Sequence, residues 1–229
     1  MDSRIKFDAL IKAQLIPDFC TDEYALIVPD GFDEKSNRVA EADAEDFLRA
    51  WETGLASHLG RGRYLFASGR LKEQFFWEGS KEAAPRKFTL WLEPIITLGA
   101  IGRLHLDHGW PVSRLRSQSN DGAFDLLAIA ANGVDISISG EVKKTEREAD
   151  QLIELMIEFG QNHSALEPSK GKLQNAFRKV RSLRSNISPI LWIIGPDRYE
   201  RIFQVNYQKD GIIALSETDK KLLSCSIHQ

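Results

Sequence analysis

Hydrophobic and polar residues alternate most regularly between residues 124 and 143, on either side of Asn132-Gly133. Alternation with a period of two is typical of a strand that buries one face, and Asn-Gly is a strong signal for a tight turn. The pattern therefore predicts a β-hairpin whose strands cover residues 124–130 and 134–143.

The length of the hairpin loop decides which side chains share a face. A two-residue Asn-Gly turn places Glu141 on the face opposite to Asp125. A three-residue loop over residues 131–133 pairs Ala130 with Val134. Asp125 then lies diagonal to Glu141 on the same face, with about 7–8 Å between the backbones. We predict the three-residue loop, because it gathers these apolar residues on one face: Phe124, Leu126, Ala128, Ala130, Val134, Ile136, Ile138 and Val142.

The elements around the hairpin follow from the same periodicities. A helix is expected over residues 94–107, with Pro94 in its first turn. The capping box Thr145-Glu-Arg-Glu148 opens another helix, and the unbroken apolar run 190–194 predicts a strand buried on both faces. The other expected elements are a segment at 87–92 that fits a strand or a helix, a strand over 112–117, a helix from about residue 169, and a closing hairpin over 201–207 and 211–215.

The first eighty residues predict a smaller α+β region that suggests no chemistry. A short strand is expected over residues 24–29, a helix over 46–59, and strands over 64–67 and 71–77. The polar segment 80–86 is the expected boundary. It separates an N-terminal region, residues 1–80, from a domain that covers residues 87–229.

Composition places the chain among ordinary globular proteins. Of its 229 residues, 42% are hydrophobic and 28% are charged, and no apolar run approaches the roughly 20 residues of a membrane span. The amino end lacks the apolar block of a secretory signal. Cys20 and Cys225 are too far apart for a metal motif. These features predict a cytoplasmic protein with no membrane partner.

Charge is distributed unevenly along the chain, although the net charge is only −3. No Asp or Glu occurs between Pro168 and Pro196. A positive stripe on an acidic body is typical of a protein that holds a polyanion at one face, and a solvated helix face is the alternative. The cations of this segment are Lys170, Lys172, Arg178, Lys179, Arg181 and Arg184.

The hairpin carries the residues that suggest chemistry. Asp125 and Glu141 supply the oxygen ligands that Mg²⁺ prefers, and Lys143 follows two residues later. A lysine beside the attacked phosphate offsets the charge that develops on it. The alternative is structural, with Asp125 as a solvated turn residue and the other two as an exposed ion pair.

Phe124-Asp125, then fifteen residues, then Glu141-Val-Lys143 resembles the motif of the PD-(D/E)xK, or restriction-endonuclease-like, superfamily. The likeness covers roughly residues 87–195 and includes the order helix, three strands, helix, buried strand. It implies an α/β fold, a mixed sheet flanked by helices, to which the α+β region predicted for residues 1–80 is an N-terminal extension. It also implies a nuclease that uses Mg²⁺, with Mn²⁺ as an alternative, and acts on DNA in preference to RNA.

Further candidates follow from the likeness and from charge. Glu93, at a helix start, resembles the additional acid that many members place near the metal. Gln151 is expected to orient a water molecule, but Leu155 stands where the RecB-like branch has a Tyr. Arg114 and Arg116 would bind phosphate or form structural ion pairs. The other residues expected to bind nucleic acid are Lys144, Lys172, Arg178, Lys179 and Arg181.

Two other functions remain open at this level. Nuclease folds that lose catalysis persist as nucleic-acid-binding or scaffolding proteins, because a fold does not dictate activity. A hydrolase of small phosphorylated molecules would use similar carboxylates in a closed pocket. Cutting both strands of a duplex needs two active sites, so a homodimer is one expectation for a nuclease.

Overall fold

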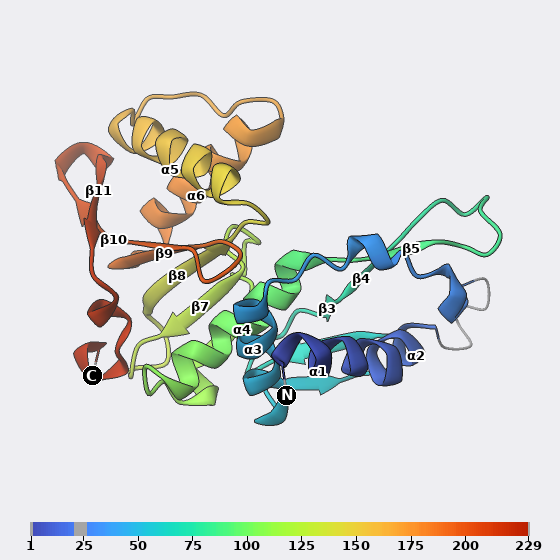
Figure 1. The fold of residues 1–229 in the computed structure, drawn as a ribbon. Helices are drawn as coiled ribbons and strands as arrows, with labels where there is room; N and C mark the ends of the chain where they lie inside the picture. Colours follow the sequence, from blue (N-terminus) through green and yellow to red (C-terminus); the bar gives the residue numbers. More distant parts are fainter. Residues whose placement is uncertain (1, 21–26, 229) are drawn as a thin grey trace.

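The computed structural model describes residues 2–20 and 27–228, which form a mixed α/β fold (Figure 1). Its central sheet has six strands in the order β11-β10-β9-β8-β7-β6. Strands β8 and β9 are parallel, and the other neighbouring pairs are antiparallel. The strands are β6 (Leu115–Ser117), β7 (Leu126–Ile129), β8 (Ile136–Val142), β9 (Ile190–Ile194), β10 (Glu200–Tyr207) and β11 (Ile213–Thr218).

Helices cover both faces of this sheet. Helices α5 (Glu146–Gln161) and α6 (Gly171–Ser185) lie on one face, and α4 (Leu92–Leu106) lies on the other (Figure 1). The predicted interior strand is confirmed, because every residue of β9 is buried. The predicted helix cap is also present, since the Thr145 hydroxyl accepts a hydrogen bond from the N–H of Glu148 at 3.2 Å.

The register of the β7–β8 hairpin differs from the prediction by two residues. Leu126 lies opposite Gly140, whereas the predicted three-residue loop pairs it with Ile138. A shift of two residues leaves Leu126, Ile138 and Val142 on the predicted apolar face, because the side chains of a strand alternate with a period of two. Phe124 and Ile136, predicted on that face, pack instead in the cluster under α5 and α6. The shared face of Asp125 and Glu141 is therefore preserved although the predicted register is wrong.

Local hydrogen bonds explain the longer loop. The Asn132 side chain accepts hydrogen bonds from the N–H groups of Val134 and Asp135, each at 3.0 Å. Such Asx turns compete with the two-residue turn that Asn-Gly suggests. A β-bulge between Ala128 and Ile129 shifts the register further. Val134, which was predicted to lie on the apolar face, is 78% exposed at the loop.

The N-terminal elements form two small sheets and several helices. Strands β1, β2 and β3 form one sheet, and β4 pairs with β5 in the other. The bounds are α1 (Ser3–Leu10), the π-helix η1 (Ile11–Leu15), α2 (Ile16–Phe19), the 3₁₀ turns η3 (Pro29–Gly31) and η4 (Glu34–Ser36), α3 (Glu41–Glu52), β1 (Ala56–His58), β2 (Arg63–Phe66), β3 (Glu73–Gln74), β4 (Phe76–Glu78) and β5 (Phe88–Leu90).

Several boundaries differ from those expected in this region. The helix predicted over residues 46–59 is α3, which begins earlier and ends at Glu52, because Gly54 adopts a positive φ of 75° and the chain then turns into β1. The strand predicted over 71–77 is divided between β3 and β4. The strand predicted over 112–117 begins as a 3₁₀ turn, η5 (Val112–Arg114). Residues 24–26 of the strand predicted over 24–29 lie outside the described residues.

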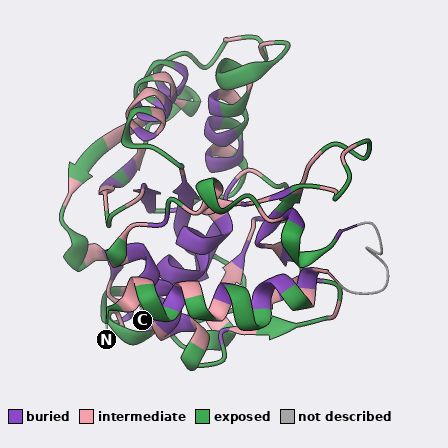
Figure 2. Ribbon diagram, turned by 45° about the vertical axis from the view of Figure 1, so that its right-hand side comes forward, coloured by how far each residue is buried: buried purple, intermediate pink, exposed green. Residues whose placement is uncertain are grey.

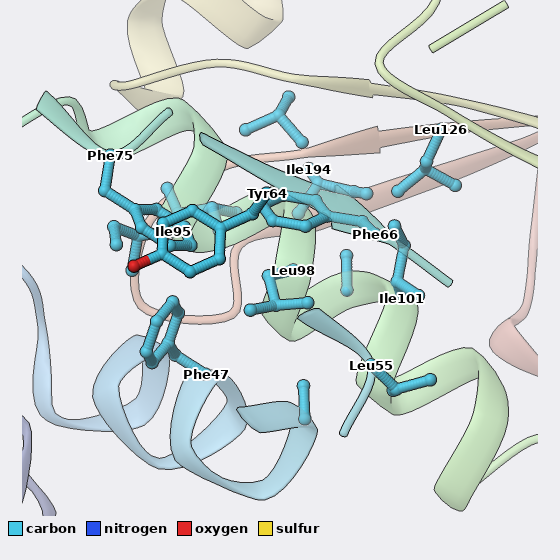
Figure 3. Close-up of a cluster of buried hydrophobic side chains, with 14 of the residues drawn as sticks. Phe47, Leu55, Tyr64, Phe66, Phe75, Ile95, Leu98, Ile101, Leu126 and Ile194 are labelled. Carbon is cyan, nitrogen blue, oxygen red and sulfur yellow. The ribbon is translucent and has the colours of Figure 1, made fainter. Parts of the chain in front are cut away.

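One hydrophobic core joins the N-terminal elements to the central sheet. Phe47 of α3 and Phe75 pack with Leu98 of α4, and the same cluster reaches Leu126 of β7 and Ile194 of β9 (Figure 3). Figure 2 shows the buried residues gathered in the middle of the molecule, on α4 and the strands. The predicted linker 80–86 connects β4 to β5, which pair as a hairpin.

No helix in the described part of the chain is both long enough and apolar enough to cross a membrane. The remaining short elements are η6 (Lys209–Gly211), η7 (Lys220–Leu223) and η8 (Cys225–His228), which follow β10 and β11.

Candidate active site

Asp125 and Glu141 lie side by side at one end of the β7–β8 hairpin. Asp125 directly precedes β7, and its N–H donates to the carbonyl of Gly140 over 3.0 Å. Its carboxylate oxygen Oδ2 accepts a hydrogen bond from the N–H of Val142 at 2.8 Å. These two bonds hold the Asp125 carboxylate beside the strand that carries Glu141.

Glu141 is enclosed between two lysines rather than placed on an open polar face. Helices α5 and α6 cover this face of the sheet, and Glu141 is only 2% exposed. Its oxygen Oε1 accepts a hydrogen bond from Lys143, and Oε2 accepts one from Lys179 at 2.6 Å. A buried carboxylate is costly without such partners, so the two ammonium groups allow Glu141 to stay ionised.

Lys179 contradicts the prediction that it faces outward to bind nucleic acid. It is 4% exposed, its ammonium group also donates to the carbonyl of Ala123, and it lies 5.3 Å from the centroid of the Phe124 ring. The helix geometry accounts for this orientation. Lys179 follows the buried Ala176 by three residues and precedes the buried Leu183 by four, so it shares their inward face.

The charges of this cluster shift one another's pKa values. Burial and the neighbouring carboxylate of Glu141 raise the pKa of Asp125 to about 8. Burial opposes ionisation of Glu141 too, but Lys179 and Lys143 outweigh it and hold the pKa of Glu141 below its ordinary value. Burial also disfavours the charge of Lys143, yet Glu141 and Asp125 keep its pKa above the ordinary value.

A cavity of about 190 Å³ brings five of the predicted residues together. Lys143 lines it from the end of β8, Glu93 from the start of α4, and Gln151 from α5. The amide oxygen of Gln151 accepts a hydrogen bond from the ammonium group of Lys172 at 2.6 Å. The other residues of the lining are Lys144, Glu148, Leu152, Leu155, Lys172 and Asn175.

Asp125 lines a second, smaller cavity of about 70 Å³, together with Glu93 and Glu73. Glu93 lines both cavities, and its carboxylate accepts a hydrogen bond from the indole N–H of Trp91 at 2.8 Å. Burial raises the pKa of Glu73, whose carboxylate accepts a hydrogen bond from the Gln118 amide at 2.8 Å. Glu73 comes from the N-terminal region, where a single acid in a two-residue strand gives no recognisable sequence signal.

The oxygen donors of this site fit a hard cation that also takes ligands from water and substrate. Within residues 2–20 and 27–228, no group of three or more His, Cys, Asp or Glu could hold a metal ion. Mg²⁺ is usually bound by one or two carboxylates, with water and phosphate oxygens completing its shell. Asp125 has no ion pair in the described chain, so it is the more available ligand. Glu141 would exchange its contact with Lys143 for the cation.

Arg114 has a structural role, although not through the ion pair that was the alternative to phosphate binding. Its guanidinium donates to the carbonyl of Ile129 at 2.6 Å and lies 4.7 Å from the centroid of the Trp110 ring. Ile129 is at the end of β7 away from Asp125, so Arg114 is not part of this site. Arg116 is half-buried on β6 and makes no ion pair within the part of the chain that the structure describes.

The remaining predicted cations lie at the surface, and two of them line the larger cavity. Arg178 and Arg181 are exposed but both pair with Glu167, at 2.7 and 2.6 Å. Glu167 immediately precedes the segment without acidic residues, so part of the expected positive stripe is neutralised locally. Lys144 and Lys172 are exposed and line the cavity itself, so they are the predicted cations nearest to the candidate chemistry.

The raised pKa of Asp125 predicts how stability depends on pH in metal-free protein. Folded Asp125 keeps its proton up to about pH 8, whereas an unfolded Asp loses its proton at about pH 4. Between these values the unfolded state binds fewer protons, so this group lowers the free energy of unfolding as the pH rises. We expect Asp125→Asn to gain stability relative to the wild type between about pH 5 and pH 8.

Urea unfolding in EDTA at several pH values measures this difference directly. Other buried acids with raised pKa values, such as Asp43 and Glu73, are present in both proteins and cancel in the comparison. A difference that stays constant with pH would contradict the raised pKa of Asp125.

No protein-family model matches this chain, and no curated protein or solved structure matches it either. The evidence on function therefore consists of the residues, their geometry and their charges.

Proposed function

We propose that this protein is a Mg²⁺-dependent nuclease that hydrolyses phosphodiester bonds in nucleic acid, with DNA favoured over RNA. One observation carries the proposal: two carboxylates, Asp125 and Glu141, adjoin at the end of a hairpin, and Lys143 links Glu141 to a cavity. The likeness of these residues to the PD-(D/E)xK motif supports the same chemistry.

Each residue of the cluster has a role that its charge and position suit. Asp125 and Glu141 would hold the cation, which when bound acts as a Lewis acid and makes water a better nucleophile. Glu93 lines both cavities, but it does not form with them a group of three that could hold the ion. The ammonium group of Lys143 lines the cavity and would offset charge on the attacked phosphate. Gln151 presents its amide to the same cavity, where it would orient a water molecule or a phosphate oxygen.

Lys179 acts in this proposal as a positioning residue. Its ammonium group donates to Oε2 of Glu141 from α6, while Oε1 accepts a hydrogen bond from Lys143, which lines the larger cavity. The carboxylate of Glu141 therefore has one oxygen anchored by the fold and one that is free to exchange partners. Held in this way, Glu141 would not need to reorganise its backbone to bind a cation.

The alternative is a catalytically inactive protein that retains a nuclease-like fold to bind nucleic acid or to serve as a scaffold. The observation in its favour is that both oxygens of Glu141 are already paired with lysines. In that case Lys143 would act as a substitute for the cation, and the site would be held together by ion pairs alone.

The deciding experiment is incubation of the purified protein with supercoiled plasmid, single-stranded DNA and RNA, each with Mg²⁺ or with EDTA. We expect cleavage that requires Mg²⁺ and that is absent from Lys143→Met protein purified in the same way, which controls for contaminating nucleases. A wild type that binds nucleic acid but leaves every substrate intact would support the inactive alternative.

A further inference from the structure

The hairpin of β4 and β5 carries an exposed tryptophan close to the candidate site. Trp77 of β4 lies opposite Thr89 of β5, and the hairpin extends away from the central sheet (Figure 1). One face of the hairpin is apolar and buried, with Phe76 and Phe88 at 1% and 0% exposure. Trp77 lies on the opposite, outer face and is 60% exposed.

This outer face continues to the candidate site through a second tryptophan. The rings of Trp77 and Trp91 meet edge to face, with their centroids 5.7 Å apart and an angle of 80° between their planes. The indole N–H of Trp91 donates to Glu93, which lines both cavities with the candidate catalytic residues. One side chain therefore separates the exposed ring of Trp77 from the candidate site.

The composition of the outer face suits a nucleic-acid strand better than an apolar partner. Lys87 is exposed and lies two residues before Thr89, so strand alternation places it on the same face as Trp77. A nearby Arg, Arg86, is paired with Glu78 instead. Proteins that hold single strands combine cations for the phosphates with aromatic rings on which bases stack.

Exposure of Trp77 has no structural explanation within the described fold. Of the five tryptophans in the sequence, the other four are buried or half-buried. A large aromatic ring left in water gives up the stabilisation that burial provides. A bound base would cover this ring without changing the fold, because the ring is already held by its contact with Trp91.

We propose that Trp77 is a stacking platform for an unpaired base next to the phosphate that the candidate site attacks, with Lys87 contacting the same strand. The proposal rests on the nucleic-acid substrate of the proposed function and adds a preference for single-stranded segments. Bases within a duplex have both faces covered by their neighbours, so an unpaired base is the one that can stack on an indole.

Binding measurements without catalysis test this proposal. Fluorescence anisotropy in EDTA, with a labelled oligothymidylate of about 15 nucleotides and with a blunt duplex of equal length, gives the two dissociation constants. We expect Trp77→Ala to weaken binding of the single strand by about tenfold or more and to leave duplex binding almost unchanged. Trp77→Phe should retain part of the affinity, because a smaller ring still stacks.

The control is Val134→Ala, which removes another exposed apolar side chain, 78% exposed, at the β7–β8 loop. It should leave both dissociation constants unchanged. The proposal is overturned if the wild type does not bind the single strand, if Trp77→Ala binds it as the wild type does, or if duplex binding weakens equally. A wild type that shows the expected binding but no cleavage would refute the nuclease assignment and leave the stacking platform intact.

Discussion

Replacing Asp125 by Asn should reduce Mg²⁺-dependent cleavage by at least about a thousandfold, which corresponds to about 4 kcal/mol of transition-state stabilisation. Asn retains the shape of the side chain and an oxygen that accepts the hydrogen bond from Val142. The substitution removes the negative charge with which residue 125 would bind a divalent cation. The fold should not be weakened, because Asp125 makes no ion pair in the described chain and burial disfavours its charge, as its raised pKa indicates.

The measurements are initial rates of plasmid or oligonucleotide cleavage and urea unfolding of the same preparations. Glu148→Gln is the matched control, since Glu148 lines the larger cavity and its ion pair among the described residues is a weak one with Lys144, at 3.9 Å. It should cleave at nearly the wild-type rate. If Asp125→Asn cleaves as well as the wild type while remaining folded, Asp125 is not a cation ligand and the proposed mechanism is wrong.

Replacing Lys179 by Met should lower the free energy of unfolding by about 3–5 kcal/mol. Met fills much of the same volume but leaves Oε2 of Glu141 and the carbonyl of Ala123 without their donor, in a site that excludes water. Lys143 still pairs with Glu141, so the carboxylate keeps one of its two cationic partners. Urea denaturation at neutral pH measures the loss.

Two further variants distinguish a broken ion pair from a general effect on α6. Arg178→Met changes the neighbouring exposed position and should alter stability by no more than about 0.5 kcal/mol. The double variant Lys179→Met, Glu141→Gln should lose less free energy of unfolding than the sum of the two single variants. The reason is that most of each single loss comes from the buried charge that remains without its partner. Additive losses would show that Lys179 contributes through packing and not through its charge.

The sequence was sufficient to predict the central α/β architecture and the shared face of the two carboxylates. These predictions rest on the alternation of apolar residues in β7 and β8, the apolar run of β9 and the capping motif at Thr145. The register itself was wrong, because the Asn132 side chain bonds to the backbone of its own loop and a β-bulge between Ala128 and Ile129 then shifts the pairing again. The facing of Asp125 and Glu141 survived this error since the shift was an even number of residues.

The sequence was insufficient where tertiary contacts decide the outcome. Lys179 was expected in water because lysines are rarely buried, and only the position of Glu141 across the sheet explains its inward direction. Glu73 joins the site from a strand of two residues, which carries no periodicity. The segment predicted as one helix over 46–59 divides into α3 and β1, since apolar residues at helical spacing also fit a helix followed by a strand.

The core that α3, α4 and the central sheet hold in common has an evolutionary consequence. Leu126 belongs to this core and is the residue next to Asp125, so packing changes near Phe47 or Phe75 are transmitted to the hairpin that bears the acid. Sequence changes in the first third of the chain are thereby coupled to the geometry of the candidate site. In related proteins, changes at Phe47 and Phe75 should therefore be accompanied by changes in β7. The N-terminal region should not be exchangeable independently of the central sheet.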